Sequence, residues 1–296
     1  MNHRKGVELP RGKTAFVIGT GPSLRDIDVS LLKDHTTITF NRAYIAFEDW
    51  GFDPTYYLAI DSNDIRSIYK DINNLILNSN IEKFFFTDTL NNEYYTHKDS
   101  YQDGDIVSSD EMLVGSEKVY YLWPDLRALN NPEAYAAFLR IRYNNLYPNK
   151  ELIPHDKAYF PVFVNDHWSS STGGANAGFC GIKVLAALGY SRIAFVGCDC
   201  RYQDDKQSNI DITTRTGVVG EEYTSHADTD INHFSPKYFG KGIHFGKPNE
   251  PDILNIWRLG AEILKRTGIQ VISCTKNSKA NEWYDYVPFE DFIKTI

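Results

Sequence analysis

The chain has 296 residues, of which 42 % are hydrophobic and 14 % aromatic, enough for a sizeable core in one large domain. It carries 31 Lys and Arg against 39 Asp and Glu, and this net charge of −8 argues against a general nucleic-acid binder, which would present a basic face. Its four cysteines form no C-x-x-C pair and do not fit a disulfide-rich secreted scaffold. No apolar stretch approaches the roughly 20 residues that cross a bilayer, and no signal peptide is recognisable, so a cytoplasmic location is expected.

Short apolar runs alternate with helical patterns, which predicts an α/β fold: a Rossmann-like, mostly parallel sheet with helices on both faces. The runs expected as strands are 14–18, 36–40, 55–60, 83–87, 192–197 and 270–274. The segments expected as helices are 23–33, 134–142, the almost wholly apolar 176–188 and the amphipathic 252–265. We expect residues 1–296 to form a single nucleotide-binding domain, with a less regular insertion at about 88–165 and a polar lid at about 201–250.

The first strand leads directly into the turn Gly19-Thr20-Gly21-Pro22-Ser23. Two glycines there allow a tight turn and the close approach of a ligand, and a following helix would offer free N–H groups to an anion. The dinucleotide pattern G-x-G-x-x-G is broken because Leu24 stands in the third glycine's place. The turn therefore favours a nucleotide other than NAD, with a purely structural tight turn as the alternative.

Polar residues follow three further strands: Asn41 and Arg42, then Asp61 to Asn63, then Asp199. Ligands of open parallel sheets bind beyond the carboxyl ends of the strands, so these groups are expected to line one site. Helix N-capping is the alternative for each residue taken singly. The Ser169–Gly174 run SSSTGG is either a second anion site or a flexible turn with a cap.

The 226–247 segment gathers histidines and lysines in an otherwise acidic protein. Histidine titrates near neutrality, which suits a general base acting on an alcohol, and nearby lysines would bind phosphate or carboxylate. A metal site built from His226, Asp228, Asp230 and His233 is the weaker alternative, because their spacing matches no strong metal pattern. The chain has no G-x-S-x-G elbow, no P-loop and no H-E-x-x-H motif.

Five blocks of sequence resemble, in the same order, the bacterial sialyltransferases that use CMP-activated sialic acid. These blocks are FVIGTGPSLRDID, FNRAY, AGFCGIKVLAALGYSRIAFVGCD, INHFSPKYFG and SCTKNSKAN. The same blocks resemble the wider superfamily of flagellin-modifying motility accessory factors and archaeal 6-hydroxymethylpterin pyrophosphokinases. The G-x-G-P-S-L and A-L-G-Y-x-x-I blocks are typical of the superfamily rather than of one substrate.

The resemblance implies a glycosyltransferase A variant with a lid, acting without a cofactor or a metal ion. It implies an inverting transfer of an acidic sugar, a sialic acid-like nonulosonate or Kdo, from a CMP-activated donor to a hydroxyl of a glycan acceptor. It assigns nucleotide binding to the first turn and the next two strand ends: Gly19, Thr20, Gly21, Ser23, Asn41, Asp61 and Asn63. The family has Asn where Thr20 stands.

The same resemblance makes His233 the catalytic base and places the phosphate-binding tyrosines at Tyr202 and Tyr223. Asn176 lies where the family has the first residue of a Thr-Ser pair that recognises the donor carboxylate. That departure leaves sialic acid itself undecided as the donor sugar. Ser171 and Thr172 are the nearby residues that would make the contact instead.

Two other functions are kept as alternatives. One is an ATP- and Mg²⁺-dependent pyrophosphokinase of the hydroxymethylpterin type, which would hold its metal on carboxylates such as Asp61 and Asp199. The other is a non-catalytic binding module with a decayed site. The sequence leaves open the acceptor, the oligomeric state and any peripheral association with the inner face of the membrane.

Overall fold

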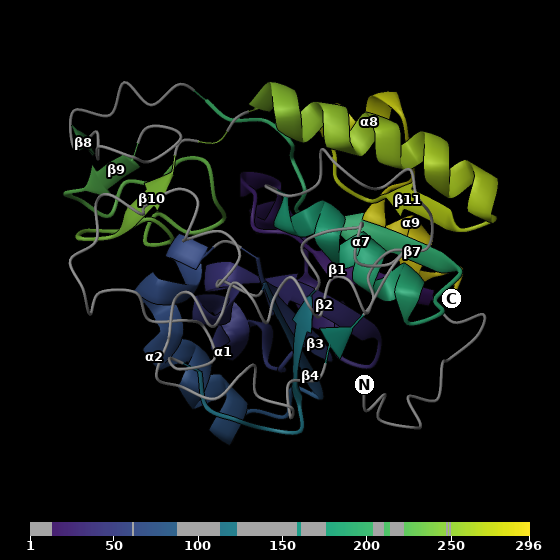
Figure 1. Ribbon diagram of the computed structural model, residues 1–296. Helices are drawn as coiled ribbons and strands as arrows, with labels where there is room; N and C mark the ends of the chain where they lie inside the picture. Colours follow the sequence, from purple (N-terminus) through teal and green to yellow (C-terminus); the bar gives the residue numbers. More distant parts are fainter. Residues whose placement is uncertain are drawn as a thin grey trace, which may run out of the picture.

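A computed structural model describes residues 14–60, 62–87, 113–122, 159–160, 176–203, 210–213, 222–246, 248 and 250–296. Figure 1 shows a central sheet with helices packed on it and a smaller sheet to one side. Among the described helices, none is both long and apolar enough to span a membrane. The expected helix at 134–142 and most of the expected insertion lie outside the described residues.

The described strands of the main sheet are all parallel, in the order β12-β11-β7-β1-β2-β3-β4-β5-β6. Their bounds are β1 (Thr14–Ile18), β2 (Thr36–Phe40), β3 (Tyr56–Ala59), β4 (Lys83–Thr87), β5 (Val119–Leu122), β6 (Tyr159–Phe160), β7 (Arg192–Val196), β11 (Gln270–Ser273) and β12 (Asp285–Tyr286). The six strands expected from sequence are confirmed to within a residue or so at their ends. The order reverses between β1 and β7, where an open α/β sheet places its ligand.

Strand β1 is buried on both faces because helices cover each side of the sheet. Ala15 and Val17 belong to one hydrophobic cluster, whereas Phe16 and Ile18 belong to the other, as the alternation of side chains along a strand requires. A run of apolar residues without polar alternation is typical of a buried parallel strand. The TAFVI sequence therefore specifies a central strand.

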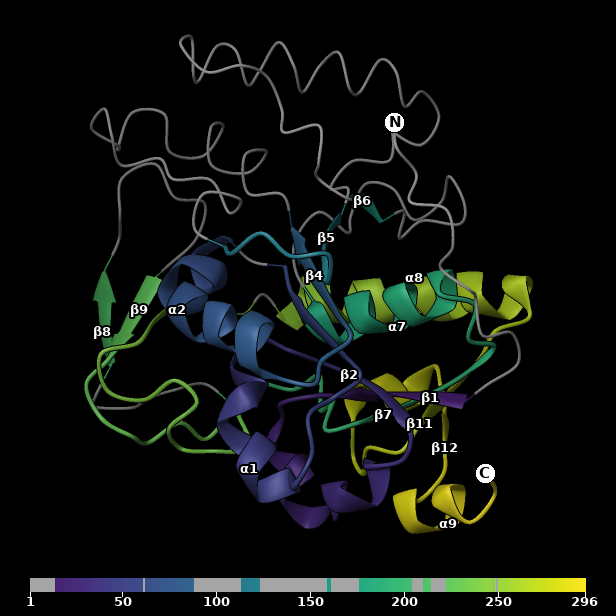
Figure 2. The ribbon, with the colours of Figure 1, turned by 90° about the horizontal axis from the view of Figure 1, so that it is seen from below.

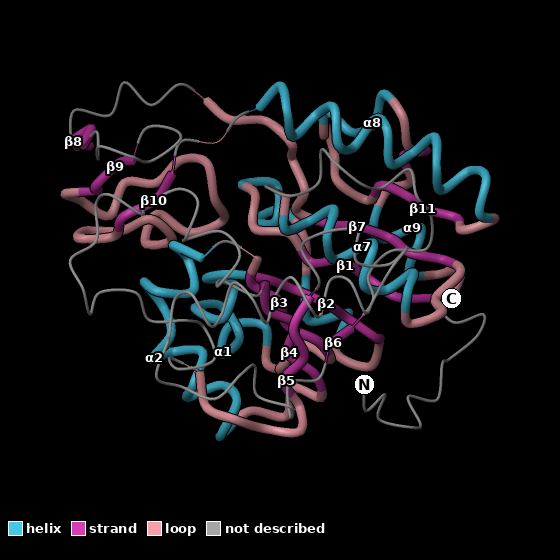
Figure 3. Tube along the Cα trace, in the orientation of Figure 1, coloured by secondary structure: helices cyan, strands magenta, loops and turns pink. Residues whose placement is uncertain are grey.

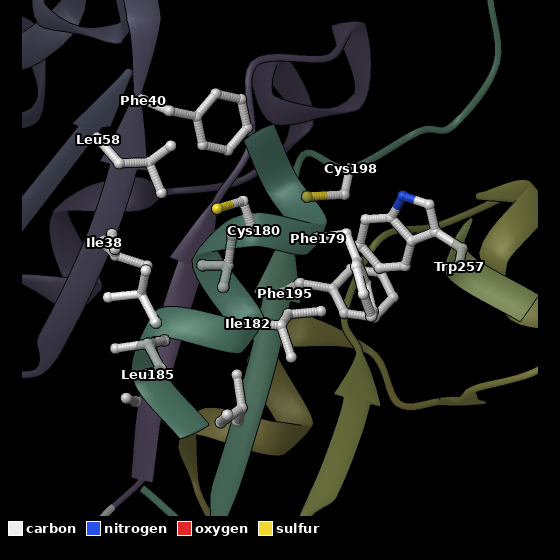
Figure 4. Close-up of a cluster of buried hydrophobic side chains, with 14 of the residues drawn as sticks. Ile38, Phe40, Leu58, Phe179, Cys180, Ile182, Leu185, Phe195, Cys198 and Trp257 are labelled. Atoms are coloured by element: carbon white, nitrogen blue, oxygen red, sulfur yellow. The ribbon is translucent and has the colours of Figure 1, made fainter. Parts of the chain in front are cut away.

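Helices α7 (Ala177–Ala187) and α8 (Glu250–Thr267) cover one face of the sheet (Figure 2). Eight successive residues of α7, from Gly178 to Leu185, are buried, which confirms the expectation of an apolar core helix. Figure 4 shows Phe179 of α7, Phe195 of β7 and Trp257 of α8 meeting in this core, and the Trp257 ring lies 4.9 Å from that of Phe195. Burial of each such side chain contributes about 1.5–3 kcal/mol.

The opposite face is covered by α1 (Phe47–Trp50), α2 (Ser62–Asn78), α9 (Phe289–Ile293) and several short 3-10 helices. Helix α2 packs through a stripe of buried isoleucines at 65, 68, 72 and 76, spaced by three or four residues as one helical face requires. Figure 3 shows the strands as a central layer with helices on either side.

The expectation of one helix over 23–33 is wrong. The structure has two 3-10 helices, Pro22–Asp26 and Val29–Leu32, separated by Ile27 in an extended conformation (φ −119°, ψ 132°). Asp28 explains the break, because its side chain accepts a hydrogen bond of 3.1 Å from the Ser30 amide and so starts a new helix.

A second, antiparallel sheet contains β8 (Ile210–Thr213), β9 (Glu222–Ser225) and β10 (His244–Gly246), in the order β10-β9-β8. It lies beside the main sheet at the left of Figure 1. The loop 226–243 joins β9 to β10, so the described part of the expected lid is a small sheet and its connecting loop. All four cysteines are buried and free.

Candidate functional site

The turns after β1 and β7 pack directly against each other at the point where the strand order reverses. The Gly19 amide donates to the Val196 carbonyl (2.7 Å) and the Gly21 amide donates to the Gly197 carbonyl (2.8 Å). The Ser23 hydroxyl donates to Asp199 Oδ2 (2.8 Å). Three of the groups that the sequence assigned to a nucleotide are therefore bonded to the protein itself in this structure.

Close packing explains the two glycines of the first turn. A Cβ atom on Gly19 would lie 2.2 Å from the Gly197 carbonyl oxygen, and one on Gly21 would lie 1.9 Å from Asp199 Oδ2. The turn therefore needs Gly21 for its own packing, in addition to the close approach of a ligand that the sequence predicts. A larger residue would push the two turns apart before it met any ligand.

Burial raises the pKa of Asp199, and the hydrogen bonds from Ser23 oppose that rise without cancelling it. The Asp199 carbonyl also accepts from the Lys279 amide (3.1 Å), which connects this turn to the segment after β11. Asp199 therefore joins three strand ends through backbone and side chain. This position is compatible with a structural role, such as the helix N-capping considered from the sequence, and also with a ligand contact.

Asn41 follows β2 with a left-handed backbone (φ 50°), which is uncommon for a residue other than glycine. Its Nδ2 donates to Asp64 Oδ2 (2.7 Å), and its backbone carbonyl oxygen accepts from the Tyr57 hydroxyl. The contact with Asp64 fixes the orientation of the side-chain amide, and the contact with Tyr57 holds the backbone. The Oδ1 atom of Asn41 is buried and has no hydrogen-bond partner.

His233 and Asp230 form a buried pair in the 226–243 loop, 8 % and 7 % exposed. Asp230 Oδ2 lies 2.8 Å from His233 Nδ1. Burial alone would raise the pKa of Asp230, but hydrogen bonds from His233, Asn232 and Phe239 outweigh it and leave the pKa lowered. The ionised carboxylate therefore favours the tautomer with the proton on Nδ1 and a free lone pair on Nε2. The described residues offer Nε2 no hydrogen-bond partner.

The carboxylates of the Asp228-Thr229-Asp230 triplet organise their own loop. Asp228 Oδ1 accepts from the Lys241 amide (2.9 Å) and Asp230 Oδ2 accepts from the Phe239 amide (3.0 Å). Both acids thus bind the backbone of the segment that follows His233. In the described parts of the chain no group of three or more His, Cys, Asp or Glu side chains is arranged to hold a metal ion.

The loop that carries His233 is bound to the first turn through backbone groups. The Phe234 amide donates to the Thr20 carbonyl (2.8 Å). Arg25 donates from Nη2 to the His233 carbonyl (2.5 Å) and from Nε to the Phe234 carbonyl (2.9 Å). Arg25 therefore connects the candidate base to the turn after β1.

The imidazole of His233 packs between two aromatic side chains of the same loop. The Tyr238 ring stacks on the imidazole at 4.0 Å, and the Phe239 ring meets it edge-on at 4.7 Å. Phe239 in turn stacks on Phe245 of β10 at 4.1 Å, and Tyr223 of β9 lies 5.6 Å from that same Phe245 ring. The structure thus brings the expected catalytic residues Tyr223 and His233 into one aromatic cluster.

Tyr202 lies on another side of the site. Its amide donates to Glu250 Oε2 (2.9 Å), and Glu250 also pairs with the Lys279 ammonium group. Burial raises the pKa of Tyr202 above its ordinary value, and nearby thiols and carboxylates raise it further. The phenol therefore keeps its proton at neutral pH and remains a hydrogen-bond donor.

Asn176, expected at the donor sugar, is the N-cap of α7. Its Oδ1 accepts from the Phe179 amide (2.9 Å) and from Trp257 Nε1 (3.1 Å). Asn63 is the second residue of α2, but its side chain lies outside the described residues, as do Asp61, Ser171 and Thr172. The residues that sequence reasoning missed are Arg25, Asp64 and Tyr238.

No protein-family model and no curated protein sequence matches the chain. Two solved structures resemble it in fold. One is a MAf glycosyltransferase from Magnetospirillum magneticum AMB-1, with 12 % sequence identity and a TM-score of 0.46. The match covers 97 % of this chain but only 34 % of the MAf chain, so this chain spans about a third of the length of the MAf protein. The other is the sialyltransferase CstII from Campylobacter jejuni, solved with a substrate analogue, cytidine-5′-monophosphate; it has 18 % identity and a TM-score of 0.44, covering 94 % of this chain and 86 % of that one.

Proposed function

We propose that the protein is an inverting glycosyltransferase that moves an acidic sugar, a nonulosonate or Kdo, from a CMP-activated donor to a hydroxyl of a glycan acceptor. The sequence resemblance supplies the reaction class. The observation that carries the proposal is the buried pair of His233 and Asp230, 2.8 Å apart, in a loop bound to the turn after β1.

His233 acts as the general base in this proposal. Asp230 accepts a hydrogen bond from Nδ1–H and stays ionised, so Nε2 can take the proton of the acceptor hydroxyl while the hydroxyl oxygen attacks the anomeric carbon. The C–O bond to the CMP phosphate breaks as the new glycosidic bond forms. A base of this kind contributes on the order of 10²–10⁴-fold to the rate.

The leaving phosphate is stabilised by donors that keep their protons. Tyr202 has this property because burial raises its pKa, and Tyr223 lies in the same aromatic cluster as His233. Thr20 and Asn41 would contact the nucleotide, while Gly19, Gly21 and Ser23 shape the turn. Asp61, Asn63, Ser171 and Thr172 remain proposed contacts of the donor. Asn176 remains one as well, through the donors of its Nδ2, because its Oδ1 already accepts two hydrogen bonds.

The test is release of CMP from CMP-N-acetylneuraminate and from CMP-Kdo by the wild-type protein, with and without EDTA. We expect turnover with at least one donor, little effect of EDTA, and loss of turnover in His233→Ala with nearly unchanged CMP affinity. His226→Ala is the matched control, because His226 is an exposed histidine of the same loop. CMP should raise the melting temperature more than UMP, AMP or NAD does.

Three results would count against the proposal. A larger thermal shift from ATP with Mg²⁺ would favour the pyrophosphokinase. Loss of activity with EDTA, restored by Mg²⁺ or Mn²⁺, would favour a metal-dependent reaction. Normal turnover in His233→Ala would remove this histidine from the role of base.

A further inference from the structure

Two buried polar atoms of the consecutive residues that follow β2 have no hydrogen-bond partner among the described residues: Asn41 Oδ1 and Arg42 Nε. Two other such atoms occur among the described residues, Arg192 Nε and Asn281 Oδ1, and they belong to other strands or loops. A buried polar group without a partner costs about 1–3 kcal/mol, so such groups are few in folded proteins. Two in succession at a strand's carboxyl end indicate a partner that the described residues do not supply.

The orientation of the Asn41 amide is determined by its neighbours. Asp64 is an acceptor when ionised, so the atom 2.7 Å from its Oδ2 is the Asn41 amide nitrogen. The carbonyl oxygen of the side chain is then the unpartnered atom, and it can only accept. The left-handed backbone of Asn41, with φ of 50°, holds this arrangement at a conformational cost that is typical of binding and catalytic sites.

Arg42 supplies a hydrogen-bond donor beside the acceptor Asn41 Oδ1, because Arg42 Nε can only donate. The position is close to the candidate base: the Arg42 backbone and the Thr20 side chain partly oppose the rise that burial causes in the pKa of Tyr238, and the Tyr238 ring stacks on His233 at 4.0 Å. A group bound at Asn41 and Arg42 would therefore lie beside the tyrosine that supports the base.

We propose that Arg42 binds the phosphate of a nucleoside monophosphate group and that Asn41 Oδ1 accepts a hydrogen bond from its ribose. An occupant that satisfies both atoms carries a donor for Asn41 Oδ1 and an acceptor for Arg42 Nε, and the ribose hydroxyls and phosphate of a nucleoside monophosphate supply these groups. Arginine is suited to bind the phosphate, since its charged donors match phosphate oxygens. This inference rests on the proposed function and adds the residue that distinguishes a nucleotide from a nucleoside.

The experiment compares CMP with cytidine by calorimetric titration of the wild-type protein, Arg42→Gln, Asn41→Gly and Arg192→Gln. Arg42→Gln should lose about 10- to 100-fold in CMP affinity and little in cytidine affinity. Asn41→Gly, which keeps the left-handed backbone, should weaken both ligands by a similar factor. Arg192→Gln is the matched control, because it removes an equally unpartnered Nε at the opposite end of the sheet, and it should leave both affinities unchanged.

The outcomes separate this inference from the proposed function. If Arg42→Gln folds, as circular dichroism would verify, and still prefers CMP over cytidine as the wild type does, the role of Arg42 is wrong while the function can stand. If the wild type binds AMP, GMP or UMP but not CMP, the CMP donor is wrong. The role of Arg42 in phosphate binding is then tested by the same comparison, made with the nucleotide that binds and its nucleoside. If no nucleoside monophosphate binds, both proposals fall.

Discussion

The Ser23 hydroxyl donates a hydrogen bond of 2.8 Å to Asp199 Oδ2, and this contact joins the two turns that flank the reversal of strand order. Burial raises the pKa of that carboxyl, with Ser23 opposing the rise. The folded protein therefore holds the Asp199 proton more tightly than the unfolded chain does. Ionisation of Asp199 at neutral pH lowers the free energy of unfolding.

The raised pKa of Asp199 predicts how the stability of the protein changes with pH. The contribution of Asp199 to stability is greatest below the ordinary Asp pKa of about 3.9 and decreases as the pH rises through its raised native value. Asp199→Asn keeps an acceptor for Ser23 but does not ionise, so its stability relative to wild type should increase across this pH range. Urea unfolding at a series of pH values measures the difference. A difference that is constant with pH, or that falls, would contradict the prediction.

Gly21→Ala should destabilise the protein by about 1–3 kcal/mol, because its Cβ would overlap Asp199 Oδ2 and force the two turns apart. Thermal unfolding provides the measurement. Gly115→Ala is the control, since a Cβ there meets nothing within 4 Å and should leave the melting temperature almost unchanged. Equal stability of the two variants would mean that the turn yields without cost.

Asp230→Asn should lower kcat by about 10²–10⁴-fold with little change in CMP affinity, because an amide donor facing Nδ1 would move the imidazole proton to Nε2. The rate of CMP release, measured against pH, tests this. Asp228→Asn is the control, because Asp228 also binds the loop backbone but does not contact His233. Equal losses in both variants would show that the loop's fold, and not the tautomer, had been disturbed.

Arg25→Ala should lower kcat by about 10- to 100-fold while CMP affinity changes less, because the base would lose its connection to the turn after β1. Added guanidinium should restore part of the rate. Arg258→Ala, which removes an exposed arginine paired within α8, should have no effect. An unchanged kcat in Arg25→Ala would mean that the Phe234–Thr20 backbone contact is enough to position His233.

Six of the nine described strands of the main sheet were predictable because buried parallel strands are continuous apolar runs, and α7 was predictable for the same reason. The short strands β5, β6 and β12 were not expected. Helix α2 was missed although its isoleucines at 65, 68, 72 and 76 recur at helical spacing. That signal was available in the sequence. The break at Ile27 was harder to see, because it depends on Asp28 capping a new turn in a segment with the pattern of one helix.

The site was less predictable than the sheet because most of its contacts join distant parts of the chain. His233 and Asp230 are three residues apart, yet their pairing depends on the amides of Asn232 and Phe239, which hold the carboxylate in place. Arg25 reaches a loop about two-thirds of the chain away, and no local pattern reveals such a contact. The reason for Gly21 likewise appeared only once the turn after β7 lay against it.

The central place of β1 has a consequence for synthesis of the protein. Thr14 pairs with Arg192, so β1 gains its second neighbour only when β7 leaves the ribosome, roughly 10–35 s after β1 itself. Until then one edge of β1 remains open, and Ala15 and Val17 lack the cover of α7. The nascent chain thus exposes an unpaired apolar strand through much of its translation, and we expect this interval to be when it depends most on chaperones and is most open to aggregation.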